Sequence, residues 1–564
     1  MMMMMSFMAF ISSHSRVGWR WRILKALYVD QLILIKATPS NTSASGVSPR
    51  TFFIVFSVSA WPWGVKWHVR RLFDAGNACR GYSRREVVFS VNPQSMTPEK
   101  RPVEDEDEQD TKKLKEDSPP SATEILQDDT SQDSVASDKA TSSDPEKKRL
   151  SLPEERGTLV YTGCTQWEYI GRRNLKCIPA MMHYIPRRIS ALKGIRVAFV
   201  TSHCSAAHSI FITEEGKVMA LGRNEKGQLG VGDTENRAGV VAMDTMAEFT
   251  VVSAAVGRNH TLLLTDRGSV FSCGDNKSGQ CGMGNTNAII HTPCRISFKE
   301  AKISKVACGA EFSMIVDKKG YLYSFGLPEY GQLGHNTDGK FFITSNKLSY
   351  QHERVPRRVP IFVERSKDGH PTPVTDVQIV DIACGNNHTV AIDAKKRAFS
   401  WGFGGYGRLG HAEPKDEFIP RLIKYFDGPN RGVEKVYCGS TFTIGLSILG
   451  IFLWGQTKRT GEANMYPKPL QDLCGWDVRS VGCSTTSIVV AADESIISWG
   501  PSPTYGELGL GESVKSSTQP KEVKTLEGAH VTQVSCGMGH TVMLVRDETE
   551  KDKEILDKLK EITL

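Results

Sequence analysis

Residues 383–389 read Ala-Cys-Gly-Asn-Asn-His-Thr, and residues 401–410 read Trp-Gly-Phe-Gly-Gly-Tyr-Gly-Arg-Leu-Gly. Motifs of these two kinds recur seven times in the 564 residues, about half a repeat out of phase. The Cys position of the first motif falls at Cys204, Val256, Cys308, Cys384, Cys438, Cys483 and Cys536. The second motif ends at Gly163, Gly222, Gly274, Gly326, Gly402, Gly455 and Gly500. A repeat of this length indicates a propeller, a solenoid or an array.

The residues between the motifs are typical of short strands and turns. Residues 261–264 and 389–392 are runs of β-forming residues, and turns rich in Gly and Asp follow the strand positions at 266–268 and 317–320. Successive Cys positions are 52, 52, 76, 54, 45 and 53 residues apart, which suits four antiparallel strands per unit. The sequence therefore predicts an all-β protein, a seven-bladed β-propeller.

The order of the two motifs at the chain ends predicts how the ring closes. Val160-Tyr161-Thr162-Gly163 precedes the first Cys motif, whereas the strand predicted at 541–545 has no aromatic-Gly motif after it. An N-terminal strand is therefore expected to complete the last blade, so that pairing of the N- and C-terminal strands closes the ring and removes exposed sheet edges. The predicted propeller spans residues 157–547.

The repeated positions do not indicate catalysis. The His position of the motif holds His208, His260, His388 and His540, but Phe312, Phe442 and Ser487 in the other three units. A residue replaced by Phe or Ser is expected to be structural. The 13 cysteines form no Cys-x-x-Cys pair, which argues against zinc and fits a reducing compartment. The Gly-rich loops lack Gly-Lys-Ser/Thr. We therefore expect no enzyme, metal, cofactor or small-molecule substrate.

The combined pattern Cys-Gly-x-x-His-Thr and Trp-Gly-x-x-x-x-Gly-Gln-Leu-Gly resembles the regulator of chromosome condensation family of seven-bladed propellers. The amino-acid sequence at 223–230, 257–261, 308–314 and 401–411 is similar to the telophase disc branch of that family. The resemblance implies a regulator and scaffold for small GTPases of the Rac, Arf and Ral types in mitosis, with possible nucleotide exchange. It also implies contacts with microtubules and with chromatin or centromere proteins. Action on Ran does not follow from the fold alone.

One interval breaks the repeat. The stretch from Cys308 to Cys384 is 24 residues longer than its neighbour, and the added residues fall within 336–378, which hold seven Lys and Arg against five Asp and Glu. A strand is predicted at 359–363 and a tight turn at Asp368-Gly369. Insertions on a propeller often form the binding face, and a tolerated surface loop is the alternative.

The resemblance places a GTPase-binding loop in this insertion. By position, its residues are Arg365, Ser366, Lys367, Asp368, Gly369, His370, Pro371 and Thr372. A basic loop suits an acidic GTPase or tubulin surface. Replacing Arg365 and Lys367 by Ala is expected to weaken GTPase binding and to leave thermal stability nearly unchanged, since exposed substitutions usually cost little.

The N-terminal leader, residues 1–95, is basic and apolar, with 12 Lys and Arg against 3 Asp and Glu. Its apolar run at 51–65 contains Pro62 and is too short for a membrane span. Three interpretations stay open: a mitochondrial transit peptide, a disordered segment, or an upstream extension of the gene with Met96 as the true start.

The tail at 96–156 is charged and poor in aromatic residues, a composition typical of disorder. Two basic clusters resemble a bipartite nuclear-import signal, made of Lys100, Arg101, Lys112, Lys113 and Lys115. Candidate phosphorylation sites are Thr97, Ser118 and Ser151. The expected locations are the nucleus and nucleolus, the mitotic chromosome, centromere and spindle, and the cytoplasm with its cytoskeleton.

The segment at 548–564 is predicted to be a charged helix, because Ile555, Leu556, Leu559 and Ile562 share a helical face. Two other functions remain for the whole chain. One is an adaptor that binds chromatin or microtubules without acting on a GTPase, and the other is a mitochondrial propeller of the same family.

Overall fold

A computed structural model of the chain describes residues 149–172, 175–298, 300–366, 368–458, 461–500 and 505–564, together with the backbone of five strands between residues 19 and 89. The chain divides into two compact units, residues 1–137 and 138–564.

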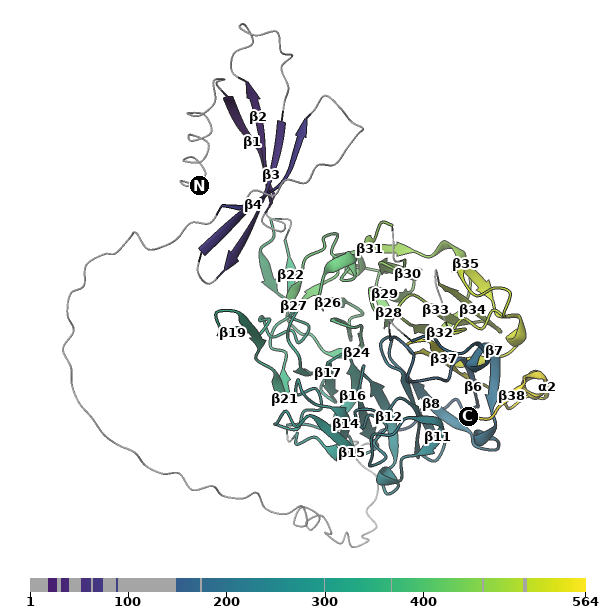
Figure 1. The fold of residues 1–564 in the computed structure, drawn as a ribbon. Coiled ribbons are helices and arrows are strands. Elements are labelled where there is room, and N and C mark those ends of the chain that lie inside the picture. The colour runs from purple at the N-terminus through teal and green to yellow at the C-terminus, as the bar shows by residue number, and fades with distance from the viewer. Residues whose placement is uncertain are drawn as a thin grey trace, which may run out of the picture. The chain divides into compact units, whose positions relative to one another are not determined.

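The second unit is a ring of seven blades (Figure 1). In each blade, neighbouring strands pair in antiparallel fashion. Blade 1 holds β8 (Val197–Thr201), β9 (His208–Thr213), β10 (Val218–Gly222) and β11 (Arg237–Ala242). Blade 2 holds β12 (Val251–Val256), β13 (His260–Thr265), β14 (Val270–Asp275) and β15 (Ile289–Arg295). Blade 3 holds β16 (Ile303–Cys308), β17 (Phe312–Asp317), β18 (Leu322–Gly326) and β21 (Glu353–Arg358).

The later blades follow the same plan. Blade 4 holds β24 (Ile379–Cys384), β25 (His388–Asp393), β26 (Ala398–Gly402) and β27 (Glu417–Leu422). Blade 5 holds β28 (Val433–Cys438), β29 (Phe442–Ser447), β30 (Gly450–Gly455) and β31 (Asn464–Pro469). Blade 6 holds β32 (Val478–Cys483), β33 (Ile488–Ala492), β34 (Ser495–Gly500) and β35 (Ser517–Glu522).

Blade 7 combines strands from both ends of the ring. It is built from β36 (Val531–Cys536), β37 (His540–Val545), β6 (Thr158–Cys164) and β7 (Met182–Ile189). The register of β37 on β6 runs from His540 opposite Gly163 to Val545 opposite Thr158. The prediction of a seven-bladed propeller closed by N- and C-terminal strands is thus confirmed, with two N-terminal strands in the last blade.

The repeated motif residues explain the blades. The second strand begins at the His position in six blades and one residue later, at Ile488, in blade 6. Strands β13 and β25 are buried along their whole length. The aromatic-Gly motif ends the third strand, where Gly402 has a φ of +98° and a Cβ would lie 2.5 Å from the carbonyl oxygen of Asn387. Only glycine fits there without strain. The core lies between adjacent blades, as where Val390 and Phe426 pack with Trp454.

The C-terminal segment fastens the closing blade. Helix α2 (Glu550–Lys558) begins with a capping box, in which the Thr549 hydroxyl accepts the Asp552 N–H and the Asp552 carboxylate accepts the Thr549 N–H. After it, β38 (Glu561–Ile562) pairs in parallel with β7. Ile562 therefore lies in a strand and not in the predicted helix. Leu556, Leu559 and Ile562 are buried.

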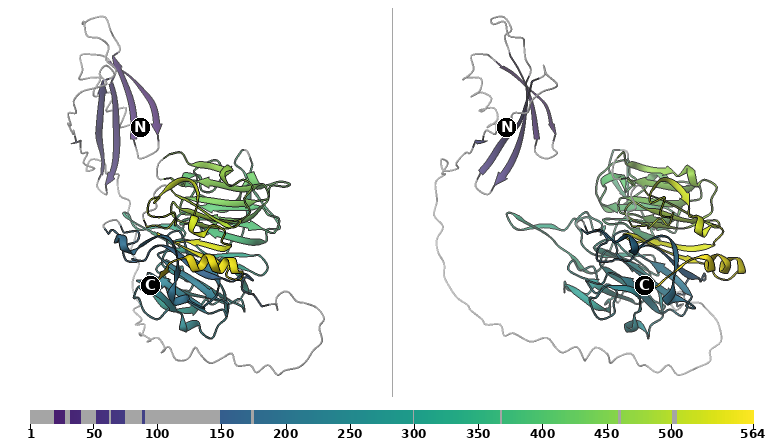
Figure 2. Two further views of the ribbon diagram at one scale, coloured as in Figure 1. Left: turned by 90° about the vertical axis from the view of Figure 1, so that its right-hand side faces the viewer. Right: turned by 45° about the vertical axis from the view of Figure 1, so that its right-hand side comes forward.

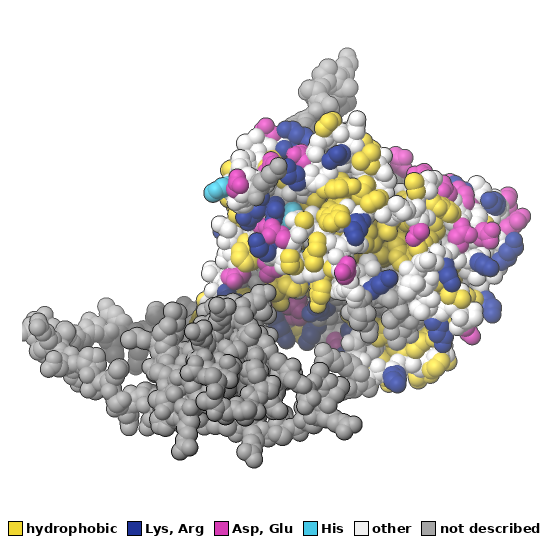
Figure 3. Space-filling model, turned by 90° about the horizontal axis from the view of Figure 1, so that it is seen from above, with side chains coloured by type: hydrophobic (Ala, Val, Ile, Leu, Met, Phe, Trp, Pro, Cys, Tyr) yellow, Lys and Arg dark blue, Asp and Glu magenta, His cyan; other side chains and the backbone are white. Residues whose placement is uncertain are grey.

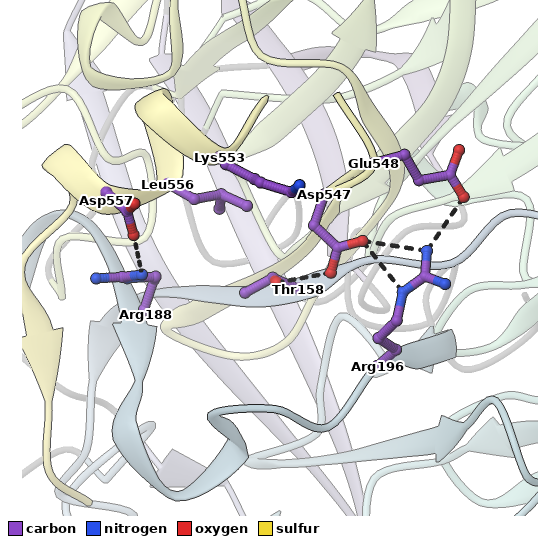
Figure 4. A pocket seen from close by; sticks show the side chains of 8 residues that line it. All are labelled: Thr158, Arg188, Arg196, Asp547, Glu548, Lys553, Leu556 and Asp557. Atoms are coloured by element: carbon purple, nitrogen blue, oxygen red, sulfur yellow. Dashed lines mark hydrogen bonds and ion pairs between the residues drawn. The ribbon is translucent and has the colours of Figure 1, made fainter. Parts of the chain in front are cut away.

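Ion pairs tie α2 and the preceding residues to blades 7 and 1 (Figure 4). Arg188 of β7 lies 2.9 Å from the Asp557 carboxylate, and Arg196 lies 3.1 Å from the carboxylates of Asp547 and Glu548. These groups line a pocket of about 600 Å³. Positive and negative side chains compensate each other there. Because these ion pairs join the C-terminal segment to blades 7 and 1, we assign the pocket to closure of the ring.

Short 3₁₀ helices occupy several connections. They are η1 (Pro179–Met181), η2 (Ser190–Leu192), η3 (Asp244–Met246), η4 (Gly405–Gly407), η5 (Lys424–Phe426), η6 (Gln471–Leu473) and η7 (Lys524–Leu526). Most of them follow the outermost strand of a blade and lead the chain into the next blade.

The first unit contains one antiparallel sheet that the sequence did not predict. Its strands lie in chain order: β1 (Trp19–Leu27), β2 (Leu32–Pro39), β3 (Phe52–Trp61), β4 (Gly64–Asp74) and β5 (Val88–Phe89). The apolar run at 51–65 is divided between β3 and β4. Among the residues that the structure describes, no helix is long and apolar enough to cross a membrane.

Candidate partner-binding hairpins

The insertion between Cys308 and Cys384 is divided among three structures. A free hairpin of β19 (Lys340–Thr344) and β20 (Lys347–Tyr350) comes first. The chain then returns to blade 3 as β21 and crosses to blade 4, where β22 (Val363–Arg365) and β23 (Pro371–Pro373) form a second hairpin. The predicted strand at 359–363 is wrong. Val359 and Phe362 are apolar because they are buried where the chain crosses between blades.

The β22–β23 hairpin widens blade 4 to six strands. Val363 pairs in parallel with Arg421 of β27, and β23 forms the new outer edge. Pro371 and Pro373 lie on this edge and offer no N–H for further pairing. The edge is therefore protected against sheet extension by another chain.

The predicted turn at Asp368-Gly369 is present at the tip of this hairpin. The Gly369 N–H donates to the Ser366 carbonyl, and the Ser366 N–H donates to the His370 carbonyl, both at 3.0 Å. Gly369 has a φ of +83°. Six residues of the proposed loop are exposed: Ser366, Asp368, Gly369, His370, Pro371 and Thr372. Lys367 lies outside the described residues.

Arg365 differs from its neighbours because it is held against blade 4. Its Nη2 lies 2.9 Å from the carboxylate of Glu417, whose side chain is only 4% exposed. Arg421 contacts the other oxygen of the same carboxylate at 2.8 Å. Arg365 Nη1 also donates to the Gly369 carbonyl at 3.3 Å. Arg365 therefore positions the hairpin, and the expectation that its loss leaves stability unchanged no longer holds.

The charges beneath the hairpin are fixed over the physiological pH range. Hydrogen bonds from Lys415 and Arg421 lower the pKa of the Glu413 carboxyl to about 2. Burial, reinforced by the charge of Arg421, lowers the pKa of His411 to about 3. The ion-pair cluster under β22 thus keeps one protonation state while the exposed tip faces solvent.

The β19–β20 hairpin carries exposed apolar side chains. Its large apolar residues are Phe341, Phe342, Ile343 and Leu348, which are 45%, 68%, 53% and 38% exposed. Phe342 is opposite Leu348 in the register, so the two side chains share one face. Figure 2 shows this teal hairpin standing off the blades. Sequence reasoning missed it, although three adjacent apolar residues in a polar insertion were a usable signal.

Other apolar side chains reach the surface among charged ones. Figure 3, which views the molecule from above, shows hydrophobic side chains gathered between basic and acidic groups. Blade 5 exposes Ile448, Leu449 and Tyr466 to 50–59%, and Tyr425 of η5, between blades 4 and 5, is 38% exposed. Scattered apolar exposure is ordinary in proteins, whereas a projecting apolar hairpin indicates a contact site.

The repeated histidines are bonded across the seams between blades. The Nε2 atoms of His208, His260 and His388 lie 3.0–3.1 Å from the Thr261, Ser313 and Thr443 hydroxyls, and that of His540 lies 2.7 Å from Ser209. Burial lowers the pKa of all four imidazoles. Within the described ranges, no group of three His, Cys, Asp or Glu is arranged to hold a metal ion.

The remaining site predictions fall near the N-terminus. The import-signal residues, Thr97 and Ser118 lie outside the described residues. Ser151 is exposed, in a segment where the Leu150 N–H donates to the Asp266 carbonyl at 2.8 Å and Arg149 pairs with the Asp266 carboxylate. Use of these residues stays a prediction.

The chain is similar to known propellers over most of its length. Residues 157–545 match the RCC1-like domain. Protein RCC2 of Mus musculus is 51% identical over 426 residues, covering 74% of this chain and 82% of that protein, and Protein RCC2 of Homo sapiens is 51% identical over 424 residues, covering 74% and 81%. The structure of Prp20p from Saccharomyces cerevisiae matches with a TM-score of 0.56 at 19% identity, covering 73% of this chain and 97% of that one.

Proposed function

Because the chain belongs to the RCC1-like family, we propose that it is a non-enzymatic regulator and scaffold that binds small GTPases. The observation that carries the proposal is the 51% identity to Protein RCC2, which extends over 82% of the mouse protein. We include Rac, Arf and Ral among the GTPases, and nucleotide exchange as a possible action.

Such a regulator needs contact surfaces and no covalent chemistry. A partner that binds the nucleotide-free GTPase more tightly than the loaded form shifts the population toward release. In the proposal, the exposed tip formed by Ser366, Asp368 and His370 contacts the GTPase, and Arg365 holds that tip in place through Glu417. The apolar β19–β20 hairpin supplies a second contact.

A second candidate is an adaptor for chromatin. The structure of Prp20p was described together with its binding to Gsp1p and histones. In this alternative, the chain binds chromatin, centromere proteins or microtubules and leaves nucleotide release unchanged. The import-like clusters around Lys100 and Lys112 support a nuclear and mitotic location as part of either proposal.

A nucleotide-release assay tests the first proposal. The full chain is mixed with Rac, Arf, Ral and Ran, each loaded with a fluorescent nucleotide, and release is followed over time. The double variant Asp368→Ala with His370→Ala is expected to lose the effect on the responding GTPase. The control is Glu215→Ala with His291→Ala, which removes one exposed acid and one exposed histidine from blades 1 and 2. Unchanged release across the whole panel would contradict the regulator.

Two further measurements separate the alternatives. Binding of purified histones without any effect on nucleotide release favours the chromatin adaptor. Imaging the tagged full chain beside a version starting at Met96 tests the location: a mitochondrial signal confined to the full chain favours the mitochondrial propeller, and a nuclear signal in both favours the mitotic regulator.

A further inference from the structure

A pocket of about 370 Å³ opens between blades 2 and 3, away from both inserted hairpins. It lies at the end of the ring where the innermost strands begin. Its walls come from the turn between β13 and β14, from the connection between β15 and β16, and from the turn after β17. Three separate segments thus converge on one concavity.

The rim of this pocket is basic. Five cationic side chains line it: Arg267, Arg295, Lys302, Lys318 and Lys319. Glu300 is the one acidic residue among the described lining residues. The side chains of Arg267, Arg295 and Lys302 form no ion pair with any residue that the structure describes.

Two neighbouring acids, Asp266 and Asp317, are held by groups other than Arg267, Arg295 and Lys302. Arg149 pairs with the Asp266 carboxylate at 3.3 Å. The buried Asp317 carboxylate accepts the Lys319 N–H, the Tyr321 N–H and the Tyr323 hydroxyl, at 2.8, 2.9 and 3.2 Å. Arg267, Arg295 and Lys302 therefore give the pocket an excess of positive charge over Glu300, its one described acidic lining residue.

The floor of the pocket is apolar and fixed. Val270, Ile296, Ile303 and Ile315 are at most 4% exposed, and the Phe298 ring packs edge-on against Tyr323 at 4.8 Å between centroids. An apolar floor keeps water from beneath a bound group and so strengthens each charge contact above it. The shape and charge together select a compact anion.

We propose that this pocket binds a multiply phosphorylated small group of the inositol polyphosphate class, either in solution or as a lipid headgroup. Several phosphates on one ring can meet Arg267, Arg295 and Lys302 at once, and Arg and Lys are the usual phosphate-binding side chains. A nucleic-acid duplex is convex and presents its phosphates along a line, so it fits a concave pocket poorly. The site is independent of the proposed GTPase contacts.

Calorimetric titration of the full chain with inositol hexakisphosphate tests the site. Arg267→Gln with Lys302→Gln is expected to weaken binding at least about tenfold, because two charge-assisted contacts to phosphate are lost. The matched control is Lys521→Gln with Lys524→Gln, which removes the same charge from exposed positions on blade 6. This control should change the affinity less than about twofold, the effect expected of distant screened charges.

Three further arms identify the source of the ligand and the part of the chain that binds it. Phosphatidylcholine vesicles with and without phosphatidylinositol 4,5-bisphosphate test the lipid headgroup, and a short DNA duplex tests nucleic acid. Hydrogen exchange at residues 295–303 reads the pocket directly, so binding by the basic leader cannot mask it. Slower exchange there with the soluble ligand or the lipid supports the proposal and names the source.

Several results would overturn the proposal. They are absence of binding to both inositol hexakisphosphate and the phosphoinositide vesicles, equal losses in the test and control variants, and unchanged hydrogen exchange at 295–303. Tighter binding of DNA, lost in the Arg267→Gln and Lys302→Gln variant, would assign the surface to nucleic acid instead.

Discussion

The seams between blades and the β19–β20 hairpin are opposite in construction. In the seams, His208 and His540 are fully buried and each is bonded to a hydroxyl of the adjacent blade. In the hairpin, Phe341 and Phe342 are exposed and every residue of β19 faces solvent. The ring therefore concentrates stability in its repeated positions and leaves its insertion available for contacts. Substitutions in the two regions should separate stability from binding.

The largest expected loss comes from the β6–β37 strand pair within blade 7, which closes the ring. Gly163 has a φ of +121°, and a Cβ there would lie 2.5 Å from the Gly539 carbonyl oxygen and from the His540 Cα. Gly163→Val should therefore cost more than about 4 kcal/mol and prevent β6 from pairing with β37. Urea unfolding measures the loss.

Gly194→Ala provides the matched control for this prediction. Gly194 also has a positive φ, +81°, but a Cβ there meets nothing within 4 Å. Only backbone strain remains, which costs about 1 kcal/mol. Equal losses in the two variants would show that the close approach between β6 and β37 is not what makes Gly163 necessary.

Acid should weaken the seams next. Burial lowers the pKa of His540 to about 4, whereas an unfolded chain holds histidine near 6.5. The stability that neutral His540 contributes is full above pH 6.5 and is lost as pH falls toward 4, because the unfolded chain takes up the proton first. The loss for this residue is about 3 kcal/mol.

Unfolding free energies measured at several pH values between 7.5 and 4.5 check this prediction. His540→Gln should weaken the pH dependence, and the part that remains should come from the other buried seam histidines, whose pKa values burial also lowers. A pH dependence that stays the same in His540→Gln would contradict the assignment to the seam.

Arg365 is half-buried at the base of the β22–β23 hairpin, so its substitution should cost an intermediate amount of stability. Arg365→Ala removes one of two cations from the buried Glu417 carboxylate, so it should lower the free energy of unfolding by about 1–2 kcal/mol. Thermal unfolding measures the change. Arg365→Lys should recover part of the loss, since a single ammonium can meet the carboxylate but not also the Gly369 carbonyl.

The sequence predicted the repeated architecture because each blade restates it. The aromatic-Gly position must be glycine where the backbone passes close to the preceding strand, as at Gly402. Such a requirement leaves a glycine at the same place in each repeat, so the sequence alone reveals it. The insertion has no second copy for comparison, so its division could not be predicted. The apolar run at 359–363 was read as a strand, although Val359 and Phe362 are buried in a crossing between blades and β22 begins only at Val363.

The candidate sites were predictable only in part. The turn at Asp368-Gly369 followed from local chemistry, whereas the ion pair of Arg365 joins it to Glu417, 52 residues away, and depends on blade packing. The lining of the basic pocket includes Arg267, Lys302 and Lys318, which come from three separate segments, so no local sequence motif predicts the pocket. Long-range convergence of this kind appears only in the folded ring.

The smallest effect on stability is expected at the tip of the β22–β23 hairpin. Asp368 and His370 are exposed, so Asp368→Ala with His370→Ala should change the free energy of unfolding by less than about 0.5 kcal/mol. The proposed GTPase contact should nevertheless be lost, and comparison of thermal unfolding with nucleotide release in the same protein preparation measures both. A stability loss as large as that of Arg365→Ala would show that the side chains of the tip stabilise the fold instead of being free for a partner. Unchanged stability with unchanged release would move the GTPase contact away from this hairpin, toward the apolar side chains of β19 and β20.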